Sequence, residues 1–94
     1  MAKLSVFTFL QKKNQYTLID VRSPAEFAAF RVPGSLNIPL QELPGKQLGG
    51  RAVLFLCLHG IRAQRACSFF QGESFYLEGG LAALAEKGFS FEEA

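Results

Sequence analysis

Residues 53–63 read Val53-Leu54-Phe55-Leu56-Cys57-Leu58-His59-Gly60-Ile61-Arg62-Ala63. An apolar, strand-like run ends at a cysteine, a short loop with one glycine follows, and an arginine then opens a predicted helix. This order places the Cys57 sulfur over the backbone N–H groups of the loop and beside the positive end of a helix dipole. Such an electropositive setting favours the thiolate, which is the nucleophilic form of cysteine. The stretch therefore predicts a buried strand that presents one reactive sulfur at its end.

Strand-like and helix-like segments alternate along the rest of the chain. The predicted strands span residues 16–21, 36–38, 52–56 and 75–77, and the predicted helices begin after Ser5, after Ser23, at Ile61 and at Leu81. Alternation with short connections is typical of a parallel sheet covered by helices on both faces. We therefore expect a single α/β domain over residues 1–94.

The helix after the first long strand has a clear start. Ser23 can cap it, Pro24 takes the first turn where no N–H is needed, and Glu26 stands three residues after the cap, as in a capping box. Ser5 can cap the preceding helix in a similar way. The apolar side chains expected to face the sheet from the helices are Val6, Phe9, Leu10, Phe27, Phe30, Ala63, Ala66, Cys67, Phe70, Leu81, Leu84 and Ala85.

The composition excludes several classes of partner and site. The formal net charge is +2, which is too mild to predict binding to nucleic acid or to an anionic membrane. The first residues lack the apolar segment of a secretory signal, and no apolar stretch approaches the roughly 18 residues that span a bilayer. Cys57 and Cys67 are the only cysteines, too few for a disulfide framework or a structural zinc site. We therefore expect a cytoplasmic protein without a metal site.

Charged residues follow the predicted strands where ligands usually bind. In open parallel sheets, ligands sit beyond the carboxyl ends of the strands. The Cys57 loop lies at that end of its strand, and so do Asp20 and Arg22 after the first long strand and Glu78 after the last. We expect Asp20 and Arg22 to brace the cysteine loop or its neighbours.

Four stretches carry recognisable motifs. They read Leu18-Ile19-Asp20-Val21-Arg22 followed by Glu26-Phe27, Val32-Pro33-Gly34-Ser35-Leu36-Asn37-Ile38-Pro39, Cys57-Leu58-His59-Gly60-Ile61-Arg62, and Leu77-Glu78-Gly79-Gly80-Leu81. Their order and spacing resemble the rhodanese family in its single-domain sulfurtransferase form, and the third is similar to the family's active-site loop, C-x-x-G-x-R. The chain departs from the family at Phe30-Arg31, where Gly-His is frequent, and at Leu84, where Trp is frequent.

The resemblance implies a central, mainly parallel five-stranded sheet flanked by helices on both faces. It also implies sulfur transfer in two half-steps through a persulfide on Cys57. The donor would be a small anion such as thiosulfate, and the acceptor would be cyanide in an assay or a cellular thiol. No metal or organic cofactor is implied.

The resemblance also gives expected roles to individual residues. Cys57 would be the nucleophile, and the loop residues around the donor would be Leu58, His59, Gly60, Ile61 and Arg62. His59 would contact the donor or point to solvent, and Arg62 would support the loop or bind substrate. Arg31 would add an anion contact or be a solvated surface charge. Cys67 is expected to pack in the core, with a resolving thiol as the alternative.

Three other functions compete with a free-standing sulfurtransferase. A cysteine-dependent phosphatase or arsenate reductase uses a related C-x5-R loop, but only four residues separate Cys57 from Arg62. The shorter ring is better matched to one sulfur atom than to a tetrahedral oxyanion. A persulfide carrier with a protein donor or acceptor has the same sequence signals as the enzyme. A regulatory module that has lost its chemistry is disfavoured by the presence of Cys57.

Overall fold

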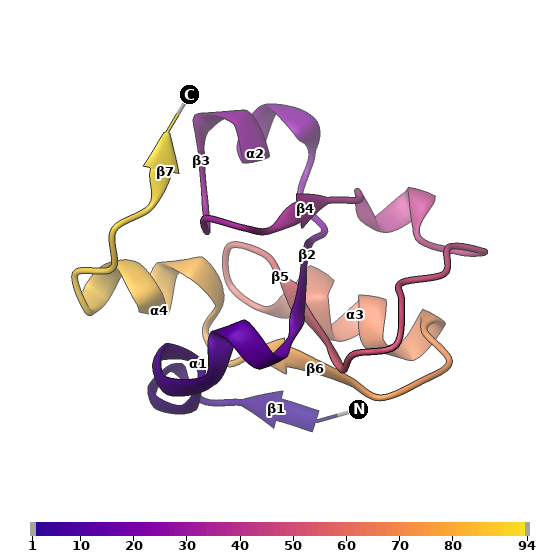
Figure 1. The fold of residues 1–94 in the computed structure, drawn as a ribbon. Coiled ribbons are helices and arrows are strands. Elements are labelled where there is room, and N and C mark those ends of the chain that lie inside the picture. Colours follow the sequence, from indigo (N-terminus) through magenta and orange to yellow (C-terminus); the bar gives the residue numbers. More distant parts are fainter. Residues whose placement is uncertain (1, 94) are drawn as a thin grey trace.

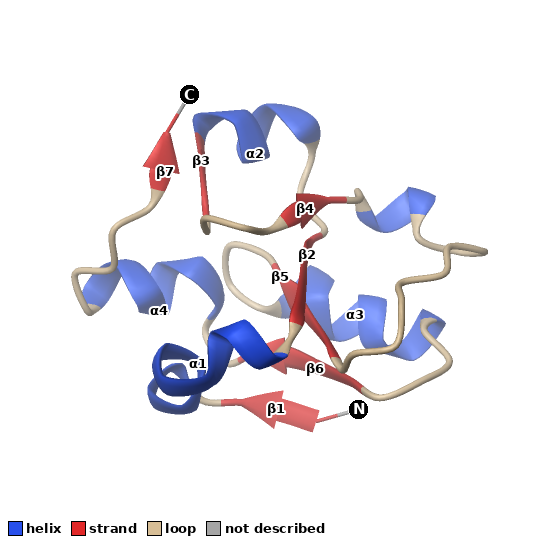
Figure 2. Cartoon of the chain, viewed as in Figure 1, coloured by secondary structure: helices blue, strands red, loops and turns tan. Residues whose placement is uncertain are grey.

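A five-stranded parallel sheet lies at the centre of the fold (Figures 1 and 2). The structure is a computed structural model and describes residues 2–93. The strand order is β1-β6-β5-β2-β4, and all neighbours in it run parallel. The strands are β1 (Ala2–Leu4), β2 (Thr17–Asp20), β4 (Leu36–Asn37), β5 (Val53–Leu56) and β6 (Ser74–Leu77). The predicted α/β fold is confirmed.

Helices cover both faces of this sheet. They are α1 (Val6–Lys12), α2 (Pro24–Ala29), α3 (Ile61–Phe69) and α4 (Gly80–Glu86), with short 3₁₀ turns η1 (Lys13–Gln15) and η2 (Leu40–Glu42). The helices α1 and α4 lie on one side and α3 on the other, while α2 lies beyond the carboxyl end of β2 (Figure 1).

The side chains of β5 divide the core into two halves. Leu54 and Leu56 pack with residues of α1 and α4, whereas Val53 and Phe55 pack with residues of α3. All four are fully buried. A strand buried on both faces reads as a continuous apolar run rather than an alternating one, which explains the sequence that leads to Cys57.

Both predicted helix caps are present. The Ser5 hydroxyl accepts a hydrogen bond of 3.1 Å from the Thr8 amide at the start of α1. At the start of α2 the capping box is complete, because the Glu26 amide donates to the Ser23 hydroxyl and the Ser23 amide donates to the Glu26 carboxylate. Local sequence therefore sets where these two helices begin.

Four side chains that were expected to face the sheet from helices do not. Phe27 of α2 lies under Arg31 and belongs to neither core cluster, and Phe30 lies in the strand Phe30–Arg31 after the helix. The other two point away from the sheet. Leu10 of α1 and Ala85 of α4 are exposed, whereas Val6 with Phe9 and Leu81 with Leu84 pack against the core. In each helix the exposed residue is four positions after the first member of the pair, which turns it about 40° away from that residue. In each of these short helices positions i and i+3 face the sheet, so position i+4 lies at the edge of the buried face.

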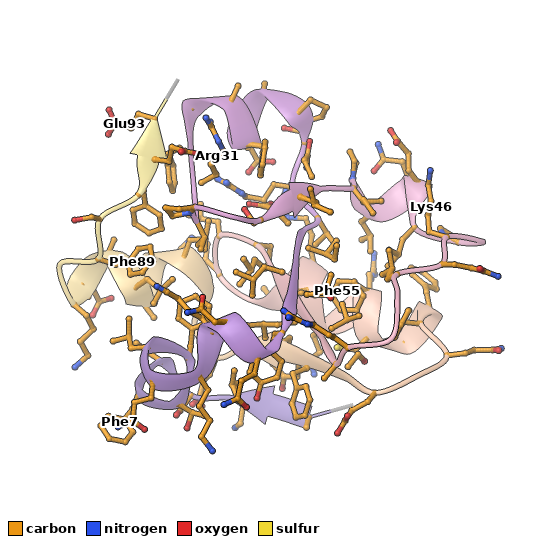
Figure 3. All side chains as sticks on the ribbon, viewed as in Figure 1. Phe7, Arg31, Lys46, Phe55, Phe89 and Glu93 are labelled. Carbon is orange, nitrogen blue, oxygen red and sulfur yellow. The ribbon has the colours of Figure 1, made fainter. Side chains whose placement is uncertain are left out.

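The sequence patterns did not reveal β1 or a second, two-stranded sheet. That sheet pairs β3 (Phe30–Arg31) antiparallel with β7 (Glu92–Glu93). Side chains add to this pairing. Arg31, labelled in Figure 3, donates to Glu92 at 3.0 Å, and the Phe30 and Phe91 ring centroids lie 5.2 Å apart. Two-residue strands have no periodicity to recognise.

Candidate active site

The Cys57 sulfur lies at the carboxyl edge of the sheet and is held by two backbone amides. Its Sγ accepts hydrogen bonds from the Gly60 amide at 3.0 Å and from the Ala63 amide at 3.3 Å. Ala63 is in the first turn of α3, where amides have no partner within the helix. Both donors aim partial positive charge at one atom, which stabilises negative charge on that sulfur.

A glycine shapes this loop. Gly60 is the N-cap of α3 with a φ of 97°, a conformation that glycine adopts at little cost. A Cβ at this position would also approach the Leu77 carbonyl oxygen to 3.3 Å. Gly60 therefore both turns its own amide toward Cys57 and lets the loop lie against the end of β6.

The first residues of α4 hold the cysteine loop in place through backbone hydrogen bonds. The carbonyls of Cys57 and Leu58 accept hydrogen bonds of 2.9 Å from the amides of Leu81 and Ala82. A Cβ on Gly80 would lie 2.5 Å from the Cys57 carbonyl oxygen and would also overlap Leu58. Only glycine fits there. This contact explains the glycine at position 80 of the Leu77-Glu78-Gly79-Gly80-Leu81 motif.

Arg62 is clamped by a carboxylate from α2. Its two terminal nitrogens donate to the two oxygens of Glu26 at 2.7 and 3.1 Å, and the Ser23 amide donates to the same carboxylate. The hydrogen bonds from Arg62 are the largest cause that lowers the pKa of Glu26 from 4.5 to about 2. Glu26 in turn raises the pKa of Arg62, with smaller contributions from Cys57 and Asp20. The capping role of Glu26 is visible in the sequence, whereas its contact with Arg62 is not.

Asp20 and Arg22 form a fully buried ion pair. Arg22 donates from Nε to Oδ1 at 3.0 Å and from Nη2 to Oδ2 at 2.8 Å, and Nη2 also donates to the Phe30 carbonyl. The Asn37 side chain donates to the carbonyls of Asp20 and Arg22. Every buried side-chain nitrogen and oxygen in the part of the chain that the structure describes has a partner. These bonds join the end of β2 to β3 and β4.

The remaining predicted residues have diverse surroundings. His59 is exposed, Ile61 is 74% exposed, and Leu58 is half-buried against the core. Arg31 donates to Glu92 and to the carbonyls of α2 and lies in the small sheet.

The second thiol lies within the core. Cys67 is buried on α3 and packs on the same side of the sheet as Phe55. Burial raises the pKa of the Cys67 thiol, which disfavours its reactive thiolate form. Its environment is that of a packed apolar residue.

Residues 2–93 contain no cluster of three or more metal-ligating side chains. No helix within that range is long and apolar enough to cross a membrane.

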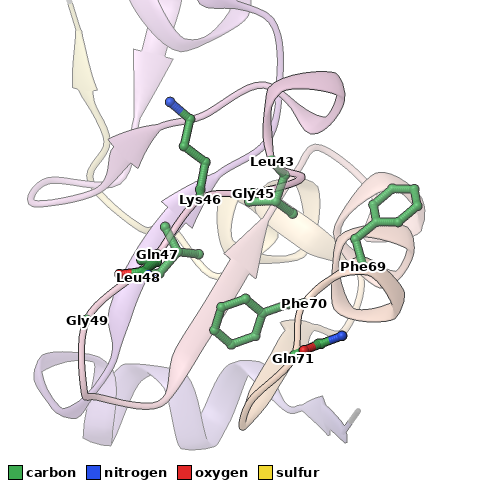
Figure 4. A pocket seen from close by; sticks show the side chains of 9 residues that line it. All are labelled: Leu43, Gly45, Lys46, Gln47, Leu48, Gly49, Phe69, Phe70 and Gln71. Carbon is green, nitrogen blue, oxygen red and sulfur yellow. The ribbon is translucent and has the colours of Figure 1, made fainter.

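A surface hollow lies beside the C-terminal end of α3, away from Cys57. It has a volume of about 630 Å³ and is lined by residues of the loop before β5 and of the end of α3. Phe70 points toward the loop that carries Leu48 (Figure 4). Cys57 lies at the opposite end of α3 and does not line the hollow.

Known proteins with similar sequences and structures identify the family of this chain. Residues 7–87 match the model of the rhodanese-like domain. A sulfurtransferase of Allochromatium vinosum is 32% identical over 78 residues, with 76% of this chain and 73% of that protein covered. A mitochondrial thiosulfate sulfurtransferase of Saccharomyces cerevisiae is 29% identical over 84 residues, with 65% of this chain and 56% of the yeast protein covered. A solved rhodanese-related protein of Thermoplasma volcanium superimposes with a TM-score of 0.91 at 25% identity over the full length of both chains.

Proposed function

The chain belongs to the rhodanese-like domain family, and from this premise we propose that it transfers sulfane sulfur through a persulfide on Cys57. The observation that carries the proposal is the pair of amides, from Gly60 and Ala63, that converge on Sγ. They are fixed by the fold before any substrate binds, and preorganised donors of this kind stabilise developing charge at low cost.

The first half-reaction is nucleophilic displacement at sulfur. The Cys57 thiolate attacks the outer sulfur of a donor such as thiosulfate, the new S–S bond forms, and the bond to the sulfonate sulfur breaks. Sulfite leaves with the electron pair. The thiolate and the thiosulfate dianion thus become the persulfide anion and the sulfite dianion, and the total charge is unchanged. In the second half-reaction cyanide or a thiolate attacks the terminal sulfur and Cys57 leaves as thiolate. Two covalent half-reactions of this kind give ping-pong kinetics.

The loop residues have distinct roles in this proposal. The Gly60 and Ala63 amides hold the sulfur, Leu58 anchors the loop in the core, and Arg62 fixes the first turn of α3 through Glu26. Ile61 and His59 form the exposed rim that a donor meets first. Asp20 and Arg22 act as positioning residues, whereas Arg31 has a structural partner in Glu92. We propose the whole chain as one such domain, in a reducing cytoplasmic setting where its two cysteines remain free thiols.

Steady-state kinetics test this proposal. Thiocyanate formation from thiosulfate and cyanide should give parallel double-reciprocal lines, and Cys57→Ser should abolish it. Cys67→Ala is the matched control, because the second thiol packs in the core, and it should retain most of the rate. Hydrolysis of an aryl phosphate by the same preparation should be absent. Phosphate turnover that depends on Cys57 would favour a phosphatase instead.

A further inference from the structure

The only guanidinium within the cysteine loop is already engaged by a carboxylate. Among residues 57–62, Arg62 is the one charged side chain. Glu26 binds it through both oxygens at 2.7 and 3.1 Å. A bidentate arginine–carboxylate pair is geometrically well defined and leaves little net charge at that position. A donor that approaches Cys57 therefore meets two backbone amides and a neutralised arginine.

We infer that Glu26 determines the class of sulfur donor, so that the site favours sulfane-sulfur donors with one negative charge over the dianion thiosulfate. This inference rests on the proposed sulfur transfer at Cys57. Its basis is that Glu26 cancels the one positive charge carried by loop residues 57–62. Organic thiosulfonates and persulfides are donors of the favoured class.

Three hydrogen bonds place the Glu26 carboxylate beside Arg62. One of its oxygens also accepts the Ser23 amide at 3.0 Å in the capping box of α2. With a pKa of about 2 it stays ionised at neutral pH. The carboxylate charge that offsets Arg62 is therefore present throughout the neutral pH range.

The rim of the loop favours the same donors. Ile61 is 74% exposed and stands next to Arg62 at the start of α3. When the outer sulfur of a donor meets Cys57, the rest of the donor lies outside the loop. An apolar substituent there can contact Ile61, whereas a sulfonate oxygen loses hydration without gaining a free cation.

Thiosulfate and methanethiosulfonate form a matched pair of probes for this inference. They differ by one charge, since a methyl group replaces one anionic oxygen, and both yield the same Cys57 persulfide. Sulfite leaves with the electron pair when thiosulfate is the donor, and methanesulfinate leaves with it when methanethiosulfonate is the donor. The quantity to measure is the ratio of kcat/KM for thiosulfate to that for methanethiosulfonate, with cyanide as the acceptor.

Glu26→Gln keeps acceptor and donor atoms for the capping box but removes the charge. We expect it to raise the ratio roughly three- to tenfold, because a freed Arg62 attracts the second charge at short range through partly screening solvent. Arg62→Gln should lower the ratio, because Glu26 is then uncompensated. The double variant should return close to the wild-type ratio, which tests the inference even if Glu26→Gln alone is unstable. Glu92→Gln is the control, because it removes a similar carboxylate from Arg31 in the small sheet.

Two results would overturn the inference. The first is an unchanged ratio in Glu26→Gln, which would show a purely structural clamp if both donors lose rate equally. The second is an equal rise of the ratio in Glu92→Gln, which would show an effect of overall charge. Intact-mass measurement of the wild type separates these from failure of the proposed function. If neither donor places sulfur on Cys57, the proposed function fails and the inference fails with it.

Discussion

The backbone amide of Leu81 donates a hydrogen bond of 2.9 Å to the carbonyl of Cys57. The start of α4 thus holds the loop that carries the sulfur, and the loop amides are left free to face that sulfur. The close approach depends on Gly80, which has a φ of 66° and no room for a Cβ. The loop and the helix beneath it therefore form one rigid unit.

Gly80→Ala should destabilise the protein and impair sulfur transfer together. Overlap with the Cys57 and Leu58 carbonyls adds to the cost of a positive φ, for a loss of about 3 kcal/mol or more in the free energy of unfolding. Urea unfolding measures it. Gly34→Ala is the control, since Gly34 has a φ of 86° but open space around its Cβ position. Equal losses in both variants would show that the contact with α4 is unimportant.

Asp20→Asn should be strongly destabilising, because it leaves the buried Arg22 without its carboxylate. Losing one partner of a buried pair costs about 3 kcal/mol or more. Glu92→Gln breaks a pair in which the carboxylate is exposed and should cost less than about 1 kcal/mol. Chemical denaturation of the two variants under the same conditions makes the comparison. If Asp20→Asn unfolds at the same denaturant concentration as the wild type, the pair does not brace the site.

The Glu26–Arg62 pair should make stability depend on pH in acid. The folded protein lowers the pKa of Glu26 from 4.5 to about 2. The stabilisation is therefore complete above pH 4.5 and is lost as the pH falls from there toward 2. Both side chains are more than a third exposed, so we expect about 1 kcal/mol or less.

A comparison of unfolding free energies tests that expectation. The free energy of unfolding of the wild type should be larger than that of Glu26→Gln at pH 7, and this difference should shrink by pH 3. A difference that is constant over this range would mean that the carboxylate charge contributes nothing to stability.

Patterns local in the chain predicted most of what positions the sulfur. The apolar run before Cys57, the capping box at Ser23 and the glycine at position 60 each act over a few residues, so their spacing is visible in the sequence. The pair between Glu26 and Arg62 joins residues 36 positions apart and exists only once α2 and α3 are placed. The edge strand β1 is three residues long and is recruited by pairing with β6. Tertiary contacts, rather than local preference, decide both features.

The central claim is that Cys57 accepts the transferred sulfur, and intact-mass spectrometry tests it most directly. After incubation with thiosulfate or methanethiosulfonate and removal of the donor, wild type and Cys67→Ala should each gain one sulfur atom. Cys57→Ser should gain none, and cyanide should remove the added mass from the other two proteins. A sulfur adduct that persists in Cys57→Ser, or a wild-type protein that gains no mass with either donor, would contradict the account.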